Sequence, residues 1–495
     1  MGRISNSLRV SRAPRTSLWL GASLLFASSA LACSAILGFE ERTLDPNASG
    51  ADASNESSTD GAASDGKGDA PVGSPSAPVD VIVAPVPVLG NVTTLAGSGT
   101  ATWTDGTGAM ASFNHPYGIA VSPVDGNVYV ADGDNHRIRK LTVAGIVTTF
   151  AGSGVGGFAD SPTPLMAQFN IPGGLAFDKA GSLYVPEFSN NRVRKVSTAG
   201  VVTTHAGSGA PDWVDGAPDI AAFNQPLSVA GDGAGNSYVA DYTNHRIRKV
   251  SPLGVVSTLA GSGVATFADG TGDQASFNSP AGIAVTASGD VYVSDNANNR
   301  IRKITSAGVV TTFAGSGTPV FGDGVGTAAG INKPTGIAWY LPTGDIYFND
   351  SGNAKVRRIT PAGVVTTLAG DDDGFADGMG TAAKFRSLQG MAVDPVGQIY
   401  IADYNNHRIR KLFVLGVGRL AVSWTPPQVS GASDILSYTA TATAPGRPTK
   451  TCTSMTIPKC TIGGLTTAAA YSVSVTATNV VGAGAASAVG AGTPN

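Results

Sequence analysis

The sequence has few of the residues that usually carry chemistry. Its 495 residues include 3 cysteines and 5 histidines, and charged residues make up 14% of the chain. It has no glycine-rich phosphate loop between a strand and a helix, and no Gly-x-Ser-x-Gly nucleophile elbow. These absences argue against nucleotide hydrolysis on a phosphate loop and against an α/β-hydrolase.

The histidines give little support for catalysis. His115 precedes Pro116 in a loop, and His205 interrupts an outer strand as the least repetitive titratable residue. The other three share one repeat position, at which further copies carry Asn or Ala, so we interpret them as structural: His136, His245 and His407. We expect no catalytic residue.

Acidic residues do not form a recognisable metal site. The run Asp371–Asp373 lacks the spacing and number of ligands that calcium needs, so we interpret it as a solvated loop. Glu187 is the one acid in its repeat position that is not Asp. The remaining recurrent acids are interpreted as turn formers: Asp105, Asp160, Asp215, Asp269, Asp323 and Asp377. We expect neither a metal nor a cofactor.

The apolar run Leu18–Ala32 is too short to span a membrane. It follows four arginines and ends in Ala-Leu-Ala before Cys33, so residues 1–32 are predicted to be a secretory signal peptide. The segment resembles a bacterial lipoprotein signal, which implies lipid attachment to Cys33, although Ala30 stands where leucine is usual. Ordinary cleavage after Ala32 without lipid is the alternative.

Residues 41–90 are rich in Ser, Asp, Ala, Gly and Pro and contain no aromatic residue. Such a segment buries too little apolar surface to order itself. We therefore predict a disordered acidic tether over residues 33–90, slightly stiffer over Pro78–Pro87.

One unit is repeated through most of the remaining chain. It is complete in Gly118–Gly154, and its opening Gly-Ile-Ala-Val tetrad recurs at intervals of 54 or 56 residues, starting at Gly174, Ser228, Gly282, Gly336 and Gly390. Each unit contains four short β-prone runs separated by turn residues. Because a single four-stranded sheet cannot bury both faces, the units must stack, and radial stacking of such sheets gives a β-propeller.

The sharpest motif within the unit is Asp132-x-x-Asn135-x-Arg137-Ile-Arg-Lys, which recurs in six copies. The Val-Tyr-Val-Ala-Asp-x-x-Asn-x-Arg-Ile-Arg-Lys run, followed by Gly-x-Val-Thr-Thr-x-Ala-Gly, resembles the NHL repeat. The resemblance implies a six-bladed propeller, which we assign to residues 91–416. Members of this family range from protein- and RNA-binding scaffolds to lyases, so the resemblance leaves the function open.

The first outer strand precedes every complete unit. Val92–Gly97 matches the Val-Thr-Thr-x-Ala-Gly strand, and the last unit, Gly390–Leu412, lacks a good copy of its own. We predict that Val92–Gly97 completes the sixth blade and closes the ring.

Residues 417–495 resemble a fibronectin type III domain, an immunoglobulin-like β-sandwich. Trp424 matches its core tryptophan and Tyr471 its corner tyrosine. The usual first strand is almost missing. Either it is very short, which we favour, or Gly416–Ala421 competes with Val92–Gly97 for the sixth blade.

The cysteine count fits this organisation. With Cys33 assigned to lipid, Cys452 and Cys460 remain within one small domain, and an extracytoplasmic location permits a disulfide between them. Metal binding at these cysteines would need further ligands nearby, and none is visible.

Two functions of different class fit the sequence. We favour a non-enzymatic scaffold, monomeric and anchored to the bacterial cell envelope by lipid alone, which binds a protein or glycan through the propeller and sandwich. An acidic, secreted chain is a poor match for nucleic acid. The alternative is an extracytoplasmic lyase or lactonase with a site in the central channel. Three or more convergent polar residues that break the repeat at the channel entrance would favour the enzyme.

Overall fold

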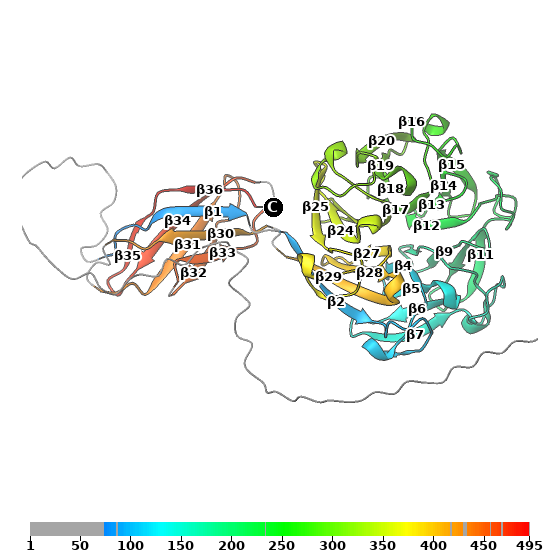
Figure 1. The fold of residues 1–495 in the computed structure, drawn as a ribbon, viewed down its shortest axis with the longest axis horizontal. Helices are drawn as coiled ribbons and strands as arrows, with labels where there is room; N and C mark the ends of the chain where they lie inside the picture. The colour runs from blue at the N-terminus through cyan, green and yellow to red at the C-terminus, as the bar shows by residue number, and fades with distance from the viewer. Residues whose placement is uncertain are drawn as a thin grey trace, which may run out of the picture. The chain divides into compact units, whose positions relative to one another are not determined.

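The structure, a computed structural model, describes residues 74–85, 88–232, 234–415, 418–428, 433–455, 457–466 and 469–494. These residues form a β-propeller and a β-sandwich, so the predicted all-β fold is confirmed (Figure 1). Within them, no helix is both long and apolar enough to cross a membrane. The predicted signal peptide, Cys33 and residues 34–73 of the predicted tether lie outside the described residues.

Six antiparallel sheets make up the propeller in the described part of the chain, and we number these blades in chain order. Blade 1 contains β4 (Pro116–Val121), β5 (Val128–Asp132), β6 (Arg137–Leu141) and β7 (Ile146–Ala151). Blade 2 contains β8 (Ala176–Phe177), β9 (Leu183–Glu187), β10 (Arg192–Val196) and β11 (Val202–Ala206). Blade 3 contains β12 (Pro226–Gly231), β13 (Ser237–Asp241), β14 (Arg246–Val250) and β15 (Val256–Ala260).

The other three blades repeat this order from the axis outward. Blade 4 contains β17 (Pro280–Val285), β18 (Val291–Asp295), β19 (Arg300–Ile304) and β20 (Val309–Ala314). Blade 5 contains β22 (Pro334–Tyr340), β23 (Asp345–Asp350), β24 (Lys355–Ile359) and β25 (Val364–Ala369). Blade 6 contains β27 (Leu388–Val393), β28 (Gln398–Asp403), β29 (Arg408–Leu415) and β2 (Leu89–Ala96).

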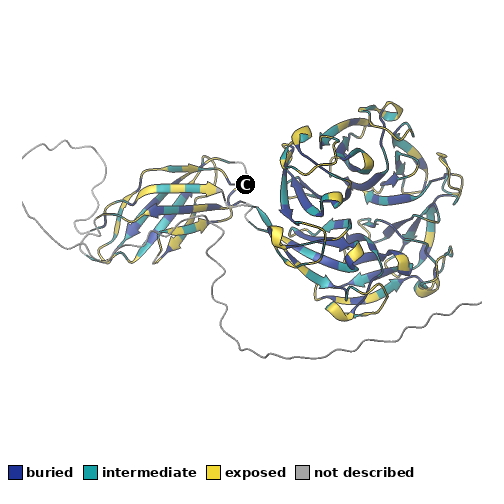
Figure 2. Cartoon of the chain, in the orientation of Figure 1, coloured by how far each residue is buried: buried dark blue, intermediate teal, exposed yellow. Residues whose placement is uncertain are grey.

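Short elements decorate the blades. A two-residue strand pairs with the outer strand of blades 1, 4, 5 and 6, namely β3 (Gly106–Thr107), β16 (Gly270–Thr271), β21 (Gly324–Val325) and β26 (Gly378–Met379). The 3-10 helices are η1 (Gly108–Met110), η2 (Gly133–Asn135), η3 (Pro164–Met166), η4 (Gly272–Gln274), η5 (Asn296–Asn298), η6 (Gly326–Ala328), η7 (Ser351–Asn353), η8 (Gly380–Ala382) and η9 (Tyr404–Asn406). Buried residues follow the strands, while loops carry most of the exposed ones (Figure 2).

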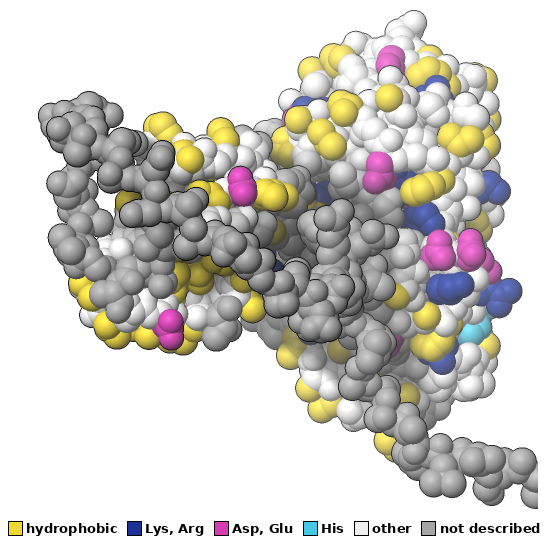
Figure 3. Space-filling model, turned by 60° about the vertical axis from the view of Figure 1, so that its left-hand side comes forward, with side chains coloured by type: hydrophobic (Ala, Val, Ile, Leu, Met, Phe, Trp, Pro, Cys, Tyr) yellow, Lys and Arg dark blue, Asp and Glu magenta, His cyan; other side chains and the backbone are white. Residues whose placement is uncertain are grey.

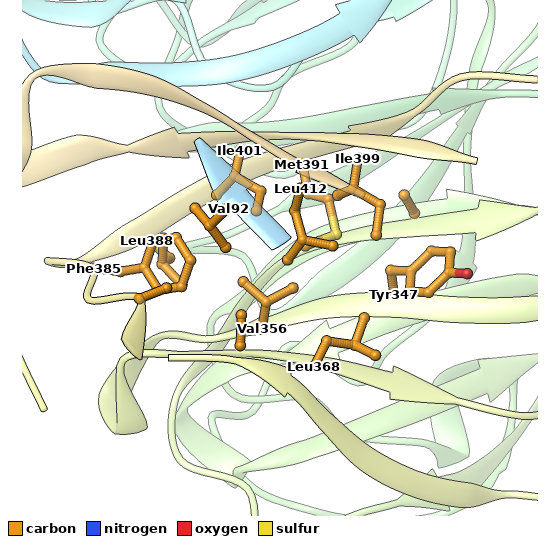
Figure 4. Packing of buried hydrophobic residues seen from close by; sticks show 13 residues of the cluster. Val92, Tyr347, Val356, Leu368, Phe385, Leu388, Met391, Ile399, Ile401 and Leu412 are labelled. Carbon is orange, nitrogen blue, oxygen red and sulfur yellow. The ribbon is translucent and has the colours of Figure 1, made fainter. Parts of the chain in front are cut away.

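The ring closes as the sequence predicted. Strand β2 is the outer strand of blade 6 and pairs with β29, with Val92 opposite Leu412. Val92 is fully buried and packs in one cluster with Leu412, Leu388 and Val356, the last of which belongs to blade 5 (Figure 4). Strands from the two ends of the propeller sequence therefore share one sheet and one core.

The glycine of the repeated tetrad lets neighbouring inner strands approach each other. A Cβ atom on Gly118 would lie 2.2 Å from the carbonyl oxygen of Gly173 in the next blade. A Cβ atom on Gly390 would lie 2.2 Å from the carbonyl oxygen of Tyr117 across the closing seam. These separations are far below van der Waals contact, so the inner strands can pack this closely around the axis only with glycine at these positions.

The third strand of each blade carries a fully buried arginine. In blade 1 Arg139 is 0% exposed, and its Nη1 donates to Asp132 Oδ2 at 2.7 Å and to the carbonyl oxygen of Ser112 at 3.0 Å. Its Nη2 donates to the carbonyl oxygen of Thr104 at 2.9 Å and to Asp105 Oδ1 at 2.7 Å. The equivalent arginines make matching bonds in the other blades: Arg194, Arg248, Arg302, Arg357 and Arg410.

This contact, which we call the arginine clamp, explains both the repeated motif and the recurrent loop aspartates. Asp105 also accepts a hydrogen bond from the backbone N–H of Thr149 at 3.0 Å, so it links the entering loop to the outer strand as well as to Arg139. The loop that crosses from one blade to the next is thereby fastened to the blade it enters. Asp105 does more than form the turn that we had expected.

The two flanking basic residues of the motif are also engaged inside their own blade. Arg137 donates to the carbonyl oxygens of Asn135 and Ser153, and its guanidinium lies 3.9 Å from the ring centroid of Trp103. Lys140 pairs with Asp125 at 2.8 Å. On the propeller face that is in view, basic and acidic side chains are interspersed (Figure 3).

At the repeat position shared by the three histidines, the side chain accepts a hydrogen bond from a backbone N–H of the next blade. His136 Nδ1 accepts the backbone N–H of Ile171 at 3.3 Å. The same bond joins His245 to Ser279, His407 to His115, Asn191 to Gln225 and Asn299 to Lys333. His and Asn interchange here because each offers one acceptor and tolerates the left-handed backbone that this position requires. At the remaining seam Ala354 offers no side-chain acceptor.

The sandwich is formed by two sheets. The first has the order β1 (Val79–Pro85), β30 (Leu420–Thr425) and β33 (Lys459–Ile462). The second contains β32 (Lys450–Ser454), β31 (Ser437–Thr443), β34 (Tyr471–Thr478) and β35 (Ala483–Ala486), and β36 (Gly490–Gly492) also pairs with β34. Tyr471 Oη accepts the backbone N–H of Thr466 at 3.0 Å, and Trp424 is buried in the core, as their sequence positions predicted.

Strand β1 corrects the predicted domain boundaries. It pairs antiparallel with β30, with Val83 opposite Val422 and Pro85 opposite Leu420. Residues 79–85 are therefore the first strand of the sandwich rather than part of a tether, and the favoured interpretation of a very short first strand was wrong. The prolines around this segment concealed its alternating valines, of which Val81 and Val83 pack against the sandwich core. The propeller is thus an insertion between the first and second strands of the sandwich.

The predicted disulfide is present. Cys452 and Cys460 are bonded, with their Cα atoms 6.1 Å apart. Cys452 lies on β32 and Cys460 on β33, so the bond joins the two sheets of the sandwich.

We expect the sandwich to depend on β1, which lies more than three hundred residues before β30 in the sequence. Residues 88–495, without β1, should keep the propeller's melting transition and lose the sandwich transition in calorimetry, because the edge of β30 and part of the core become exposed. As a control, residues 74–85 joined by a short Gly-Ser linker to residues 418–495 should fold, whereas residues 418–495 alone should not. A stable fold of 418–495 alone would contradict this assignment.

We expect the three seam histidines to make stability depend on pH. Burial lowers the pKa of His136, His245 and His407 below the ordinary 6.5, and each must be neutral for its Nδ1 to accept the seam bond. Their contribution is therefore complete above about pH 6.5 and is lost as the pH falls below it, because the unfolded chain then binds more protons.

Replacing all three histidines by Asn, the residue of two other seams, should flatten the dependence of the urea unfolding free energy between about pH 7 and about pH 5. Burial lowers the pKa of His205 to about 4. Because His205 is present in both proteins, it adds the same pH dependence to both unfolding free energies. Identical pH profiles for the two proteins would contradict the seam role.

Candidate ligand site at the channel mouth

All six blades contribute to a cavity of about 600 Å³ at one end of the propeller. Its lining comes from the starts of the inner strands and from the residues after the second strands, which lie at the same edge of each sheet. We call this cavity the mouth. Its lining includes His115, Tyr117, Asp134, Ile171, Phe188, Leu227, Tyr242, Asn296, Lys333, Thr335, Ser351, Asp373, Ser387, Gln389 and Tyr404.

The mouth is built from the positions at which the repeats differ. The second residue of each Asn-x-Pro segment, or of its equivalent in blade 6, has a backbone φ between 48° and 54°, yet its side chain changes from blade to blade: His115, Ile171, Gln225, Ser279, Lys333 and Ser387. A left-handed backbone costs a non-glycine residue roughly 1–2 kcal/mol. Five residue types are nevertheless found at these six positions, on a backbone that is the same in every blade, and four of the six residues line the mouth: His115, Ile171, Lys333 and Ser387.

His115 forms a polar cluster with Asp134 of its own blade and with Tyr404 and His407 of blade 6. Its Nδ1 lies 2.6 Å from Asp134 Oδ2, and its ring stacks on Tyr404 with the centroids 4.4 Å apart. The ring of His407 also lies close to that of His115, with the centroids 4.6 Å apart. The side chains of His115 and Asp134 are 29% and 41% exposed, so the pair is accessible from the mouth.

Tyrosine hydroxyls converge on the same space. Burial, together with the nearby Tyr242 and Tyr404, raises the pKa of Tyr117 far above its usual value. Burial and Asp134 also raise the pKa of Tyr404. Both phenols therefore stay protonated at physiological pH and can donate hydrogen bonds to a ligand. Phe188 and Tyr242 contribute a further pair of rings, 6.3 Å apart.

Below the mouth the channel narrows sharply. A second cavity of about 30 Å³ lies between the inner strands, and Gly174, Gly282, Gly336 and Gly390 are among the residues that line it. This volume has room for about one water molecule. The close approach of the inner strands thus gives the mouth a floor, so the mouth is a basin and not a wide passage.

The acidic residues that the sequence singled out have separate roles. Glu187 is fully buried and pairs with Arg194 at 2.9 Å in the arginine clamp of blade 2. Asp373 lines the mouth and pairs with Arg386 at 3.3 Å. In the part of the chain that the structure describes, no group of three His, Cys, Asp or Glu side chains is placed to hold a metal ion.

The histidines also separate by role. His205, on β11, packs edge-on against Tyr184 of β9 and does not line the mouth. His136 and His245 serve as seam acceptors, and His407 does so while also touching His115. His115, which we had assigned only to a loop, lies in the mouth.

The aromatic and polar lining of the mouth was not found from the sequence. Tyr117, Phe188, Tyr242, Lys333 and Tyr404 occupy positions where the repeat copies disagree. The residues that the copies share belong to the arginine clamp, so the repeat motif by itself indicates the clamp and not the lining of the mouth. The sequence signal that could have indicated the mouth is the difference between the repeat copies at these positions, which lie next to positions that are nearly the same in every copy.

Comparison with known proteins identifies both domains. The NHL repeat model matches residues 113–141, 277–304 and 385–412, and the fibronectin type III domain model matches residues 416–492. The chain therefore carries NHL repeats and a C-terminal fibronectin type III domain, as its motifs predicted.

Relatives share the repeat region at low identity. The chain is 28% identical over 285 residues to Protein SUPPRESSOR OF QUENCHING 1, chloroplastic, of Arabidopsis thaliana, which covers 54% of this chain and 27% of that protein. It is 28% identical over 335 residues to NHL repeat-containing protein 2 of Bos taurus, covering 62% of this chain and 40% of that protein. The chain thus spans less than half of the length of these curated relatives.

Two solved structures from Bacteroides thetaiotaomicron share the fold. One, titled a structural genomics protein of unknown function, has a TM-score of 0.52 at 22% identity and covers 66% of this chain and 76% of its own. The other, titled an auxiliary nutrient binding protein, has a TM-score of 0.51 at 17% identity and covers 66% of this chain and 77% of its own.

We expect the axial glycines and the mouth residues to differ in their effect on stability. Gly118→Ala should lower the urea unfolding free energy by about 2 kcal/mol or more, because its Cβ would overlap the backbone of blade 2. Ser387→Gly, at a mouth position with φ 54°, should change it by less than about 1 kcal/mol, since relief of the left-handed backbone offsets the greater freedom of the unfolded chain. Comparable losses in the two variants would contradict the assignment of Gly118 to the packing of the ring and of Ser387 to a position that the fold leaves free to vary.

Proposed function

We propose that this chain, with its NHL repeats and fibronectin type III domain, is an extracytoplasmic binding protein that holds a small polar molecule or the end of a glycan in the mouth. The observation that carries the proposal is that the side chains lining the mouth differ from blade to blade on a backbone that repeats in every blade. A surface that merely supported the ring would have no reason to differ in each blade.

The composition and size of the mouth favour a small ligand over a flat protein surface. A volume of about 600 Å³ lies within the range typical of small-molecule sites. Its mixture of aromatic rings with hydroxyl, amide and charged groups can pack against the apolar face of a ligand and hydrogen-bond its polar edge. The auxiliary nutrient binding protein that shares the fold is in keeping with this role.

Placement outside the cytoplasm is supported by the disulfide between Cys452 and Cys460, because such bonds persist in oxidising compartments. The lipoprotein-like signal before Cys33 supports anchoring to the cell envelope. We propose that lipid on Cys33 holds the protein at the membrane and that residues 34–73 separate the anchor from the folded part. Mass spectrometry of the mature amino terminus tests the lipid.

An enzyme is the second candidate, favoured by the His115–Asp134 pair. His115, Lys333 and Gln389 are polar residues that line the mouth and break the repeat, which is the pattern expected of an enzyme. We place binding first because only His115 among them is paired with a group that orients it for proton transfer, whereas Lys333 and Gln389 suit ligand binding equally well. Asp134 can hold the Nδ1–H of His115, which leaves Nε2 free to take a proton from a ligand or a water molecule. Proton abstraction of this kind would suit a lyase or a lactonase.

We expect ligand binding to require the mouth. Residues 74–495 are screened on a glycan array and against a small-molecule library by thermal shift, and each hit is measured by calorimetry. Phe188→Ala should weaken binding by about tenfold or more, because the ring lines the mouth. Leu253→Ala, an exposed control in the turn at the other end of blade 3, should leave binding unchanged. Equal effects of the two substitutions would contradict the site.

The same ligand separates the two candidates. Incubation with wild-type protein, followed by ligand NMR, should return the ligand unchanged if the protein is a binding protein. Conversion by wild-type protein, lost in His115→Gln while binding persists, would instead establish the enzyme.

A further inference from the structure

The mouth has two unlike halves that face each other across the axis. Blades follow one another around the ring, so blades 2 and 3 lie opposite blades 5 and 6 (Figure 1). The lining from blades 2 and 3 is mostly apolar or aromatic: Ile171, Gly173, Phe188, Leu227 and Tyr242. The lining from blades 5 and 6 is mostly polar: Lys333, Thr335, Ser351, Gly352, Asp373, Ser387, Gln389 and Tyr404.

Most charges in the mouth are already paired, and Lys333 is the exception. Asp134 lies against His115 at 2.6 Å, and Asp373 pairs with Arg386 at 3.3 Å. Among the described residues no carboxylate lies within ion-pair distance of the Lys333 ammonium, which is exposed at the mouth. The backbone N–H of Lys333 donates to Asn299 Oδ1 at 3.0 Å, so the seam bond holds the backbone from which this lysine projects.

Polar groups near Lys333 use hydrogen-bond donors within the protein and so have fewer to offer a ligand. The Thr335 hydroxyl donates to the carbonyl oxygen of Leu388 at 2.8 Å, and Asn296 Nδ2 donates to the carbonyl oxygen of Pro334 at 2.9 Å. The Thr335 hydroxyl proton and one of the two Asn296 amide protons are therefore occupied within the protein. Lys333 therefore provides the free positive charge of the polar half, with the side chains of Ser387 and Gln389 beside it on blade 6.

We propose, building on ligand binding at the mouth, that the preferred ligand is a ring compound bearing one carboxylate. Its ring packs against Phe188 and Leu227, and its carboxylate pairs with Lys333 on the opposite side. One ammonium matches one carboxylate, whereas a doubly charged phosphate would leave a negative charge near Asp134 and Asp373. The apolar half contains no charged side chain to pair with a second charged group, and Tyr242 supplies its only side-chain hydroxyl among the described lining residues.

The test uses pairs of ligands that differ in charge but hardly in shape: D-glucuronate against D-glucose, and benzoate against benzamide. Calorimetry on residues 74–495 should show the acid of at least one pair binding about tenfold tighter than its neutral partner. Lys333→Gln should remove this preference, and Phe188→Ala should weaken both members of the pair. Lys179→Gln, an exposed control in the turn at the other end of blade 2, should retain the wild-type preference.

Thermal melts first establish that each variant is folded. Equal binding of acid and neutral ligand, or a preference for the acid that survives Lys333→Gln, would overturn the carboxylate assignment. If neutral ligands bind and Phe188→Ala weakens them, ligand binding at the mouth stands and only the charge preference fails. If neither the paired ligands nor the wider screen gives a ligand sensitive to Phe188→Ala, both proposals fail.

Discussion

The burial of one guanidinium in each blade is the constraint on which the propeller depends. A buried arginine is costly unless every charge and polar group around it is paired. Arg139 meets most of this condition, because its two terminal nitrogens bind two carboxylates and two backbone carbonyls, which come from the hairpin of its own blade and from the loop that enters it. Its buried Nε has no hydrogen-bond partner among the described residues. The residues of the Asp-x-x-Asn-x-Arg-x-Arg pattern are spaced as they are because this set of partners must meet at one point.

The clamp, the axial glycines and the seam bonds together hold the backbone of the mouth. Each acts at a place where the repeats agree or interchange residues of like geometry, such as His407 and Asn191. Most side chains that face the basin can vary, because their backbone is positioned by other residues, although Thr335 and Asn296 also bond the backbone of the next blade. A repetitive scaffold can therefore carry an irregular site, and the differences between blades are the part of the sequence that describes a ligand.

Because the propeller is inserted into the sandwich, the chain crosses between the two domains twice, once before β2 and once after β29. Strands β2 and β29 close the propeller, and the neighbouring segments β1 and β30 pair within the sandwich. The same two stretches of chain are thus brought together twice, once in each domain. Folding either pair lowers the entropy cost of bringing the other pair together, because the loop between β1 and β30 is already closed by the ring.

The sequence by itself determined the strand content, the repeat period, the closing role of Val92–Gly97 and the disulfide between Cys452 and Cys460. These features follow from local patterns: alternation of apolar residues, turn residues at fixed offsets, a missing outer strand and two cysteines left in one domain. The three-dimensional structure decided the rest. The pairing of β1 with β30 joins segments separated by the whole propeller, and no local pattern specifies so distant a partner. His115, Phe188 and Lys333 come together only because the ring brings equivalent edges of six blades to one axis, so residues far apart in sequence become neighbours through closure alone.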